Sequence, residues 1–138
     1  MSAIDTPNPP TSGDCRSMFV FSNNFVANGS LSEWNTTGVT RMGGMFKQVN
    51  LTADISKWDF SSIVTGSTGL GTFLNSGSLT TANYDLLLKA LATDQYYTTP
   101  SGLTFDGGNS TYTTAASAGY RSTLTTGKSW TITDGGGI

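Results

Sequence analysis

Two carboxylates on either side of a tryptophan are the first candidates for chemistry in this sequence, because Asp54 and Asp59 flank Trp58. A glycosidase needs two positioned carboxylates, one as acid and one as base or nucleophile. However, Asp59 takes the place that Asn35 has in a similar segment, and Asn or Asp at such a place is typical of a turn. We therefore expect Asp59 to be structural and the protein not to be an enzyme, with a small glycan-active enzyme left as a third hypothesis.

Other catalytic and metal chemistries lack the residues that they need. The chain has no His, so the commonest general base and metal ligand are missing, and its many Ser and Thr residues have no evident base. Its single cysteine, Cys15, excludes an internal disulfide, and we expect it to be a small buried hydrophobic residue. No Asp-x-Asp-x-Asp series offers a calcium loop. We therefore predict no catalytic residues, no metal site and no cofactor.

The composition limits the classes of partner. Thr, Ser and Gly make up 57 of the 138 residues, and charged residues are 12%, where roughly 25% is usual. Seven basic residues against nine acidic ones give no basic field for a nucleic acid. No apolar run approaches the roughly 20 residues that cross a bilayer. We expect one folded domain with neither a nucleic-acid partner nor membrane insertion, and its 3 Trp, 5 Tyr and 7 Phe argue against disorder.

The N-terminal stretch of the chain differs from the rest. Pro7, Pro9 and Pro10 favour an extended chain, and this stretch lacks the basic and apolar regions of a secretory signal. We expect residues 1–13 to form an extended Pro-rich N-terminal arm, either free or lying along a neighbouring subunit. A single repeat domain is expected over residues 14–138.

Two segments of the chain resemble each other at a constant offset. Three pairs of apolar positions share this offset, namely Leu31 with Ile55, Trp34 with Trp58, and Val39 with Ile63. Phe46 and Phe73 are slightly further apart, which requires a short insertion around residues 66–70. Since Trp is rare, a common offset at three positions indicates true repeats. We place the repeats at about residues 25–48 and 49–75, and a closing module at about residues 79–138.

These repeats carry a recognisable pattern. The first reads Leu31-Ser-x-Trp34-Asn-Thr-x-x-Val39-Thr-x-Met42-x-x-Met45-Phe46, and the second reads Asp54-Ile-Ser-x-Trp58-Asp-x-Ser-x-Ile63-Val-Thr65. Both resemble the BspA-like leucine-rich repeat of bacterial surface proteins, although residues 66–73 depart from its Met-x-x-Met-Phe pattern. The final Trp130-Thr-Ile-Thr-Asp-Gly-Gly136 resembles the closing module that follows such repeats. The resemblance covers about residues 14–136 and implies an architecture, while such repeats occur on many unrelated surfaces.

Two helices are expected to support the repeats. Residues 81–92 place apolar side chains on one face of a helix, with Thr80 or Thr81 as its N-cap. Residues 114–125 predict a weaker helix with Ala116, Tyr120 and Leu124 on one side.

Residues 103–105 and 129–133 are expected to be strands, and residues 134–137 a fraying end. Strands that alternate with helical segments imply parallel pairing through crossovers. We therefore predict an α/β fold, a short leucine-rich-repeat-like solenoid with parallel strands and helical turns and about four rungs.

The apolar positions of the repeats and the closing module are expected to stack as a core ladder. Its predicted members are Leu31, Trp34, Val39, Met45, Phe46, Ile55, Trp58, Ile63, Phe73, Leu88, Phe105, Trp130 and Ile132. The two repeat tryptophans, Trp34 and Trp58, could instead form an exposed carbohydrate platform. Their repetition at one offset favours the core, because the interior of a solenoid needs the same residue at each rung.

Without a catalytic set, a structural or binding role is expected. The first hypothesis is a non-enzymatic, exposed component of a phage virion, such as a capsid decoration protein or a tail or fibre part. It would bind other virion proteins at the virion surface and could form a homo-oligomer. The alternative is an adhesion module at the bacterial cell surface or outside the cell, which binds a host protein or a glycan. The short chain, its Ser, Thr and Gly content and the signal-free start favour the first.

Overall fold

The computed structural model describes residues 14–16 and 29–138, which contain short helices and strands. In chain order these are α1 (Gly29–Ser32), β1 (Asn50–Leu51), β2 (Ser78–Leu79), α2 (Thr81–Thr93), β3 (Thr104–Asp106), β4 (Thr111–Tyr112), α3 (Thr114–Ser122), the π-helical turn η2 (Thr123–Gly127), β5 (Thr131–Thr133) and β6 (Gly136–Gly137). The arm expected over residues 1–13 lies outside the described residues.

The strands pair in parallel with segments that follow at nearly constant spacing. Three two-stranded sheets join β1 to β2, β3 to β5 and β4 to β6. Similar lengths of chain separate the Cα partners, which include Asn50 with Ser78, Thr104 with Thr131, and Thr111 with Gly136. Parallel partners require a crossover, which the intervening turns and helices supply.

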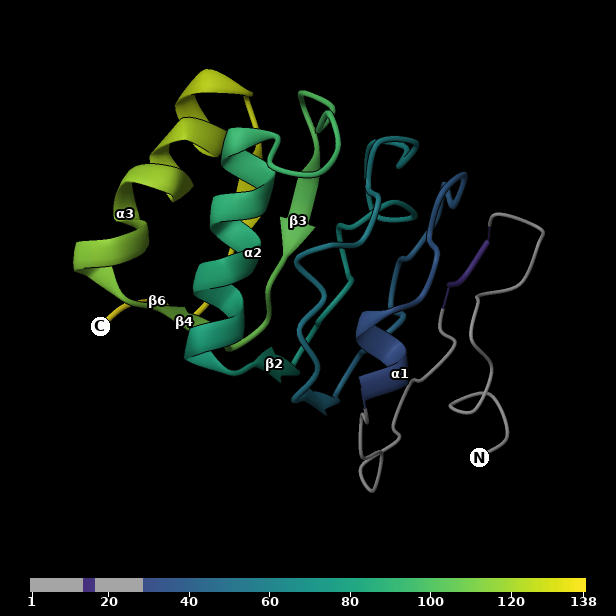
Figure 1. Ribbon diagram of the computed structural model, residues 1–138, viewed down its shortest axis with the longest axis horizontal. Helices are drawn as coiled ribbons and strands as arrows, with labels where there is room; N and C mark the ends of the chain where they lie inside the picture. The colour runs from purple at the N-terminus through teal and green to yellow at the C-terminus, as the bar shows by residue number, and fades with distance from the viewer. Residues whose placement is uncertain (1–13, 17–28) are drawn as a thin grey trace.

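In Figure 1 the successive segments lie side by side along the long axis, from α1 towards one end to α3 at the other. The solenoid with about four rungs stays our prediction, and the even spacing of the parallel partners supports it.

Residues that the sequence aligned lie next to one another in the structure. The indole rings of Trp34 and Trp58 stack with their centroids 6.1 Å apart and their planes 3° from parallel. The backbone N–H of Phe46 donates to the carbonyl of Phe73 at 3.0 Å. The two offsets read from the sequence are therefore the separations along the chain between residues that lie side by side in consecutive repeats. We call these stacked repeats layers.

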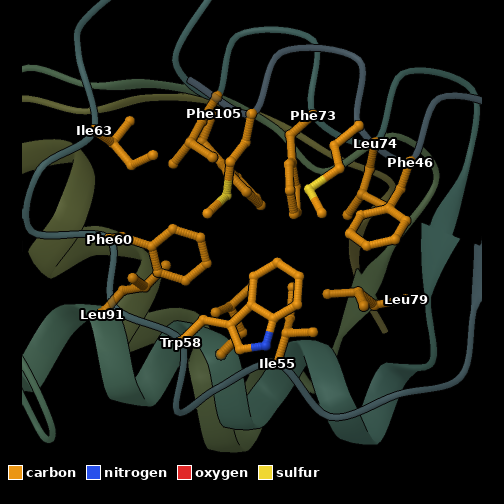
Figure 2. Packing of buried hydrophobic residues seen from close by; sticks show 14 of the residues in the cluster. Phe46, Ile55, Trp58, Phe60, Ile63, Phe73, Leu74, Leu79, Leu91 and Phe105 are labelled. Atoms are coloured by element: carbon orange, nitrogen blue, oxygen red, sulfur yellow. The ribbon is translucent and has the colours of Figure 1, made fainter. Parts of the chain in front are cut away.

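The predicted ladder residues lie in the interior. Twelve of the thirteen are buried, and the last, Ile132, is partly buried and packs against the same cluster. Trp34 and Trp58 are 4% and 2% exposed, so neither can form a carbohydrate platform. Figure 2 shows Phe46, Phe73 and Phe105 on one side of the core, facing Trp58 and Phe60.

Helix α2 begins and ends at residues that cap it. The Thr80 side chain accepts a hydrogen bond from the Asn83 backbone N–H at 3.2 Å, so the predicted N-cap is confirmed. Asp94, in the left-handed conformation with φ 50°, ends the helix. The buried face carries Tyr84, Leu87, Leu88 and Leu91, as the apolar spacing predicted.

The second predicted helix is correct in place, and Leu124 and Tyr120 pack against the core as expected, but Ala116 was assigned to the buried side wrongly. Ala116 is exposed, and Ser117 is buried beside it. Ser117 is buried because its hydroxyl donates a hydrogen bond to a carboxylate oxygen of Asp85 on α2 at 2.6 Å. Apolar periodicity cannot register a serine that is buried by a hydrogen bond. The helix also continues beyond α3 as the π-helical turn, which buries Leu124.

A left-handed backbone conformation recurs before three of the short strands, although the residue types differ. Gln48, Ser76 and Gly108 each lie shortly before a short strand, and their φ angles are 60°, 58° and 61°. Left-handed backbone is unfavourable for a residue with a Cβ by roughly 1–2 kcal/mol. The first two layers therefore hold strained residues where the third has glycine.

Replacing Gln48 by glycine is expected to raise the free energy of unfolding by up to about 1 kcal/mol, because relief of left-handed strain exceeds the entropy that glycine adds to the unfolded chain. Urea unfolding followed by circular dichroism measures this change. The neighbouring Lys47→Gly variant is the control and should lose about 0.5–1 kcal/mol. Equal losses in both variants would contradict the strain at Gln48.

Candidate interaction site

The two carboxylates first singled out for chemistry are turn residues. Asp54 Oδ1 accepts from the Ser56 backbone N–H at 2.9 Å, and Asp59 Oδ1 accepts from that of Ser61 at 2.8 Å. Asn35 makes the same contact with the Thr37 N–H at 3.1 Å. Such i to i+2 bonds are Asx turns, so the structural role predicted for Asp59 is confirmed.

This use of carboxylates extends across the part of the chain that the structure describes. All seven of its aspartates accept a hydrogen bond from a backbone N–H, and they are Asp14, Asp54, Asp59, Asp85, Asp94, Asp106 and Asp134. The one glutamate, Glu33, is exposed. Aspartate is short enough to reach a nearby N–H, whereas glutamate is not favoured in such turns. The aspartates of the described residues therefore all take part in fixing the backbone.

The Cys15 thiol is also poorly suited to nucleophilic chemistry. Its side chain is buried at 2% exposure, and burial raises its pKa to about 11, with a further contribution from the charge of Asp14. A thiol with such a pKa stays protonated at neutral pH and is a poor nucleophile. Within the described ranges, no helix is long and apolar enough to cross a membrane.

The C-terminal Asp-Gly-Gly-Gly is not a fraying end, which corrects our expectation. Its strand β6 pairs with β4, and the Asp134 side chain is 2% exposed. Asp134 accepts from the Tyr84 hydroxyl at 2.6 Å and forms an ion pair with Arg121 at 2.9 Å. Burial and the neighbouring carboxylate raise the pKa of Tyr84, so its phenol remains a donor. These contacts hold the chain end against α2 and α3.

Asp85 on α2 accepts hydrogen bonds from residues at the N-terminus of α3. It accepts from the Thr113 backbone N–H at 2.8 Å, from the Thr113 hydroxyl at 2.7 Å and from Ser117. Burial raises the pKa of Asp85, but the hydrogen bonds from Ser117 and Thr113 together outweigh it and lower the pKa below its usual value. The Asp85 carboxylate therefore fixes the N-cap residue of α3 and the side chain of Ser117 in the first turn.

Because its pKa is lowered in the folded state, Asp85 stabilises the protein above its unfolded pKa, and this stability is lost as the pH falls through the folded value. The Asp85→Asn variant is expected to have a free energy of unfolding lower by about 1–2 kcal/mol at pH 7, as measured by urea unfolding. This difference in free energy between the variant and the unchanged protein should narrow below about pH 4. Ser117→Ala, which removes one donor, should lose less. A difference in free energy of unfolding that does not change with pH would contradict stabilisation by the ionised carboxylate of Asp85.

The most prominent exposed aromatic residues lie on the loop that follows α2, residues 94–102, which we call the aromatic loop. Tyr96 and Tyr97 are 44% and 43% exposed. The Lys57 ammonium lies 5.8 Å from the centroid of the Tyr96 ring, within the range of a cation–π contact. The second repeat and the closing module therefore meet at this loop.

The aromatic loop is held at both ends. At its start, Asp94 accepts from the Thr99 backbone N–H at 2.8 Å and forms an ion pair with Lys128. At its end, the Trp130 indole N–H donates to the carbonyl of Pro100 at 2.8 Å, and the N–H of Gly102 donates to that of Lys128 at 2.7 Å. The tyrosines are thus exposed on a fixed backbone.

A small pocket lies beneath the two tyrosines. It is lined by Tyr96, Tyr97, Ser56, Trp58 and Phe60, among others, and its cavity volume is about 10 Å³. This is close to the space that one water molecule needs. The pocket can therefore take one small group, while a whole substrate would have to lie on the loop above it.

Sequence reasoning did not find this site. It considered an exposed aromatic platform only at Trp34 and Trp58, and favoured the core for both; Trp58 is buried and lines the pocket. The available signal was the pair Tyr96-Tyr97 directly after a helix, followed by Thr-Thr-Pro100. Paired aromatics in a polar loop stand out because such residues usually enter the core.

Comparison with known proteins gives one match. Residues 2–81 match the family described as "Mycoplasma protein of unknown function, DUF285". This family is associated with BspA-like repeats, which agrees with the resemblance of the two repeats to that class. Most of the closing module, at about residues 79–138, lies beyond the matched residues. No curated protein and no solved structure matches the chain.

Proposed function

This chain belongs to the DUF285 family, and we propose that it is a non-enzymatic interaction protein that binds its partner through the aromatic loop. The observation that carries the proposal is the pair Tyr96 and Tyr97, exposed on a backbone fixed by Asp94, Lys128 and Trp130. Tyrosine is enriched at binding surfaces because it offers a large apolar face and a hydroxyl. A loop ordered before binding loses little entropy when it binds.

The exterior of a phage virion is one place for such a protein. A capsid decoration protein or a tail or fibre part would bind other virion proteins, with the possibility of a homo-oligomer. An exterior dominated by Thr, Ser and Gly, with 12% charged residues overall, supports an exposed position of this kind.

The bacterial cell surface is the second place, and a specific observation favours it. The matched family is described as Mycoplasma proteins and is associated with BspA-like repeats. As an adhesion module, the protein would present the aromatic loop to a host protein or a glycan.

Electron microscopy of the native source with gold-labelled antibody tests the proposal. We expect label on the outside of virus particles in the first case and on the cell envelope in the second. Label confined to the interior of particle-free cells would contradict both. Purified protein should also attach to unlabelled particles or cells, and the double variant Tyr96→Ala/Tyr97→Ala should lose this attachment. Leu86→Ala is the control, since Leu86 is 46% exposed on α2, outside the aromatic loop.

A further inference from the structure

We propose that the aromatic loop binds a neutral pyranose residue of a glycan, with the sugar ring against the tyrosines and one small substituent in the pocket. The proposal rests on the interaction role given above and names the chemical class of its ligand. A pyranose has a face of C–H groups and a rim of hydroxyls. A tyrosine side chain offers the matching surfaces, an apolar ring and a hydroxyl.

The exposed aromatic area matches a small ring, and a protein partner would need further contacts around the loop. Tyr96 and Tyr97 are 44% and 43% exposed, and with about 150–250 Å² for a whole aromatic side chain this leaves roughly 200 Å² of surface. A stable protein interface buries about 800 Å² on each partner. Leu86 and Ile138, the other large hydrophobic residues that are exposed in the described ranges, lie outside the aromatic loop.

The pocket is lined by a serine whose hydroxyl is available to a ligand. Ser56 lines the pocket and is 8% exposed. Its backbone N–H donates to Asp54, but its hydroxyl makes no hydrogen bond with any residue that the structure describes. A hydroxyl group of a sugar has the size of the pocket and would form a hydrogen bond with this serine.

The charges around the loop favour a neutral ligand. Asp94 and Lys128 form an ion pair with each other, and the ammonium of Lys57 lies against the Tyr96 ring. Rings and hydroxyls therefore dominate the contact surface, without the cluster of cations that binds acidic groups.

Saturation-transfer NMR on the full chain tests the proposal with three neutral probes, namely cellotriose, maltotriose and chitotriose. We expect transfer to the ring protons of at least one probe. Tyr96→Ala and Tyr97→Ala should each weaken its binding about tenfold or more, because a stacking surface is removed. Tyr97→Phe should retain binding, and Ser56→Val, which fills the pocket, should reduce it. Leu86→Ala should leave it unchanged.

Absence of transfer from all three probes at millimolar concentration overturns the proposal. So does binding that neither tyrosine variant weakens. If sugar binding fails while antibody still labels the particle or cell exterior, and the double tyrosine variant still loses attachment, only the glycan inference fails. The interaction role would then stand with a partner of another class.

Discussion

Replacing Trp58 by alanine is expected to lower the free energy of unfolding by about 3–5 kcal/mol. The indole is 2% exposed and lies 6.1 Å from the Trp34 ring and 6.0 Å from that of Phe46, centroid to centroid. Its N–H donates to the carbonyl of Leu31 at 3.0 Å, in the preceding repeat. Alanine would leave a cavity between two layers and a buried carbonyl without its donor.

Urea unfolding followed by far-UV circular dichroism measures this loss. Trp58→Phe is the matched variant, since it keeps an aromatic ring but removes the bond to Leu31, and we expect a loss of about 1–3 kcal/mol. Tyr97→Ala, which empties no core site, should change stability by about 0.5 kcal/mol or less. A near-neutral Trp58→Ala would mean that the indole does not join the layers.

Gly108→Ala is expected to cost about 2–5 kcal/mol, the sum of a left-handed conformation and a backbone clash. The φ angle of Gly108 is 61°. A Cβ at this position would collide with the carbonyl oxygens of Leu74 and Gly77, both of them backbone atoms of the preceding layer. Those segments cannot move freely, because the Leu74 N–H donates to Asp106 at 3.0 Å and the Asn109 N–H donates to Gly77 at 2.7 Å.

Gly102→Ala separates the two contributions to this loss. The φ angle of Gly102 is 75°, but a Cβ there would meet no atom within 4 Å. Its substitution should therefore cost only the conformational part, about 1–2 kcal/mol. Thermal unfolding of both variants gives the comparison. Equal losses would show that the layers at Gly108 are not packed as closely as the structure has them.

Much of the framework could be read from local patterns. Helix α2 follows from its apolar spacing and from Thr80, because both the face that packs on the core and the capping residue are visible in the local sequence. The pairing of Trp34 with Trp58 follows from the shared offset. The burial of Ser117 on α3 could not be read, since its bond to Asp85 comes from another helix.

The candidate site was not predictable for a similar reason. Tyr96 and Tyr97 are exposed because residues of other segments, Lys128 and Trp130, hold the loop that carries them. The local sequence shows two tyrosines in a polar loop, but it does not show the contacts with other segments that keep them exposed.

By itself the sequence determined the repeat spacing, the turn role of Asp59 and which apolar residues enter the core, because periodicity and short-range hydrogen bonds are properties of neighbouring residues. Only the tertiary structure decided that the exposed aromatics are Tyr96 and Tyr97, and that they share a small pocket with Trp58. It also decided that Asp134 is buried against Tyr84 and Arg121 instead of fraying. These outcomes depend on contacts between segments far apart in the chain, which local pattern does not encode.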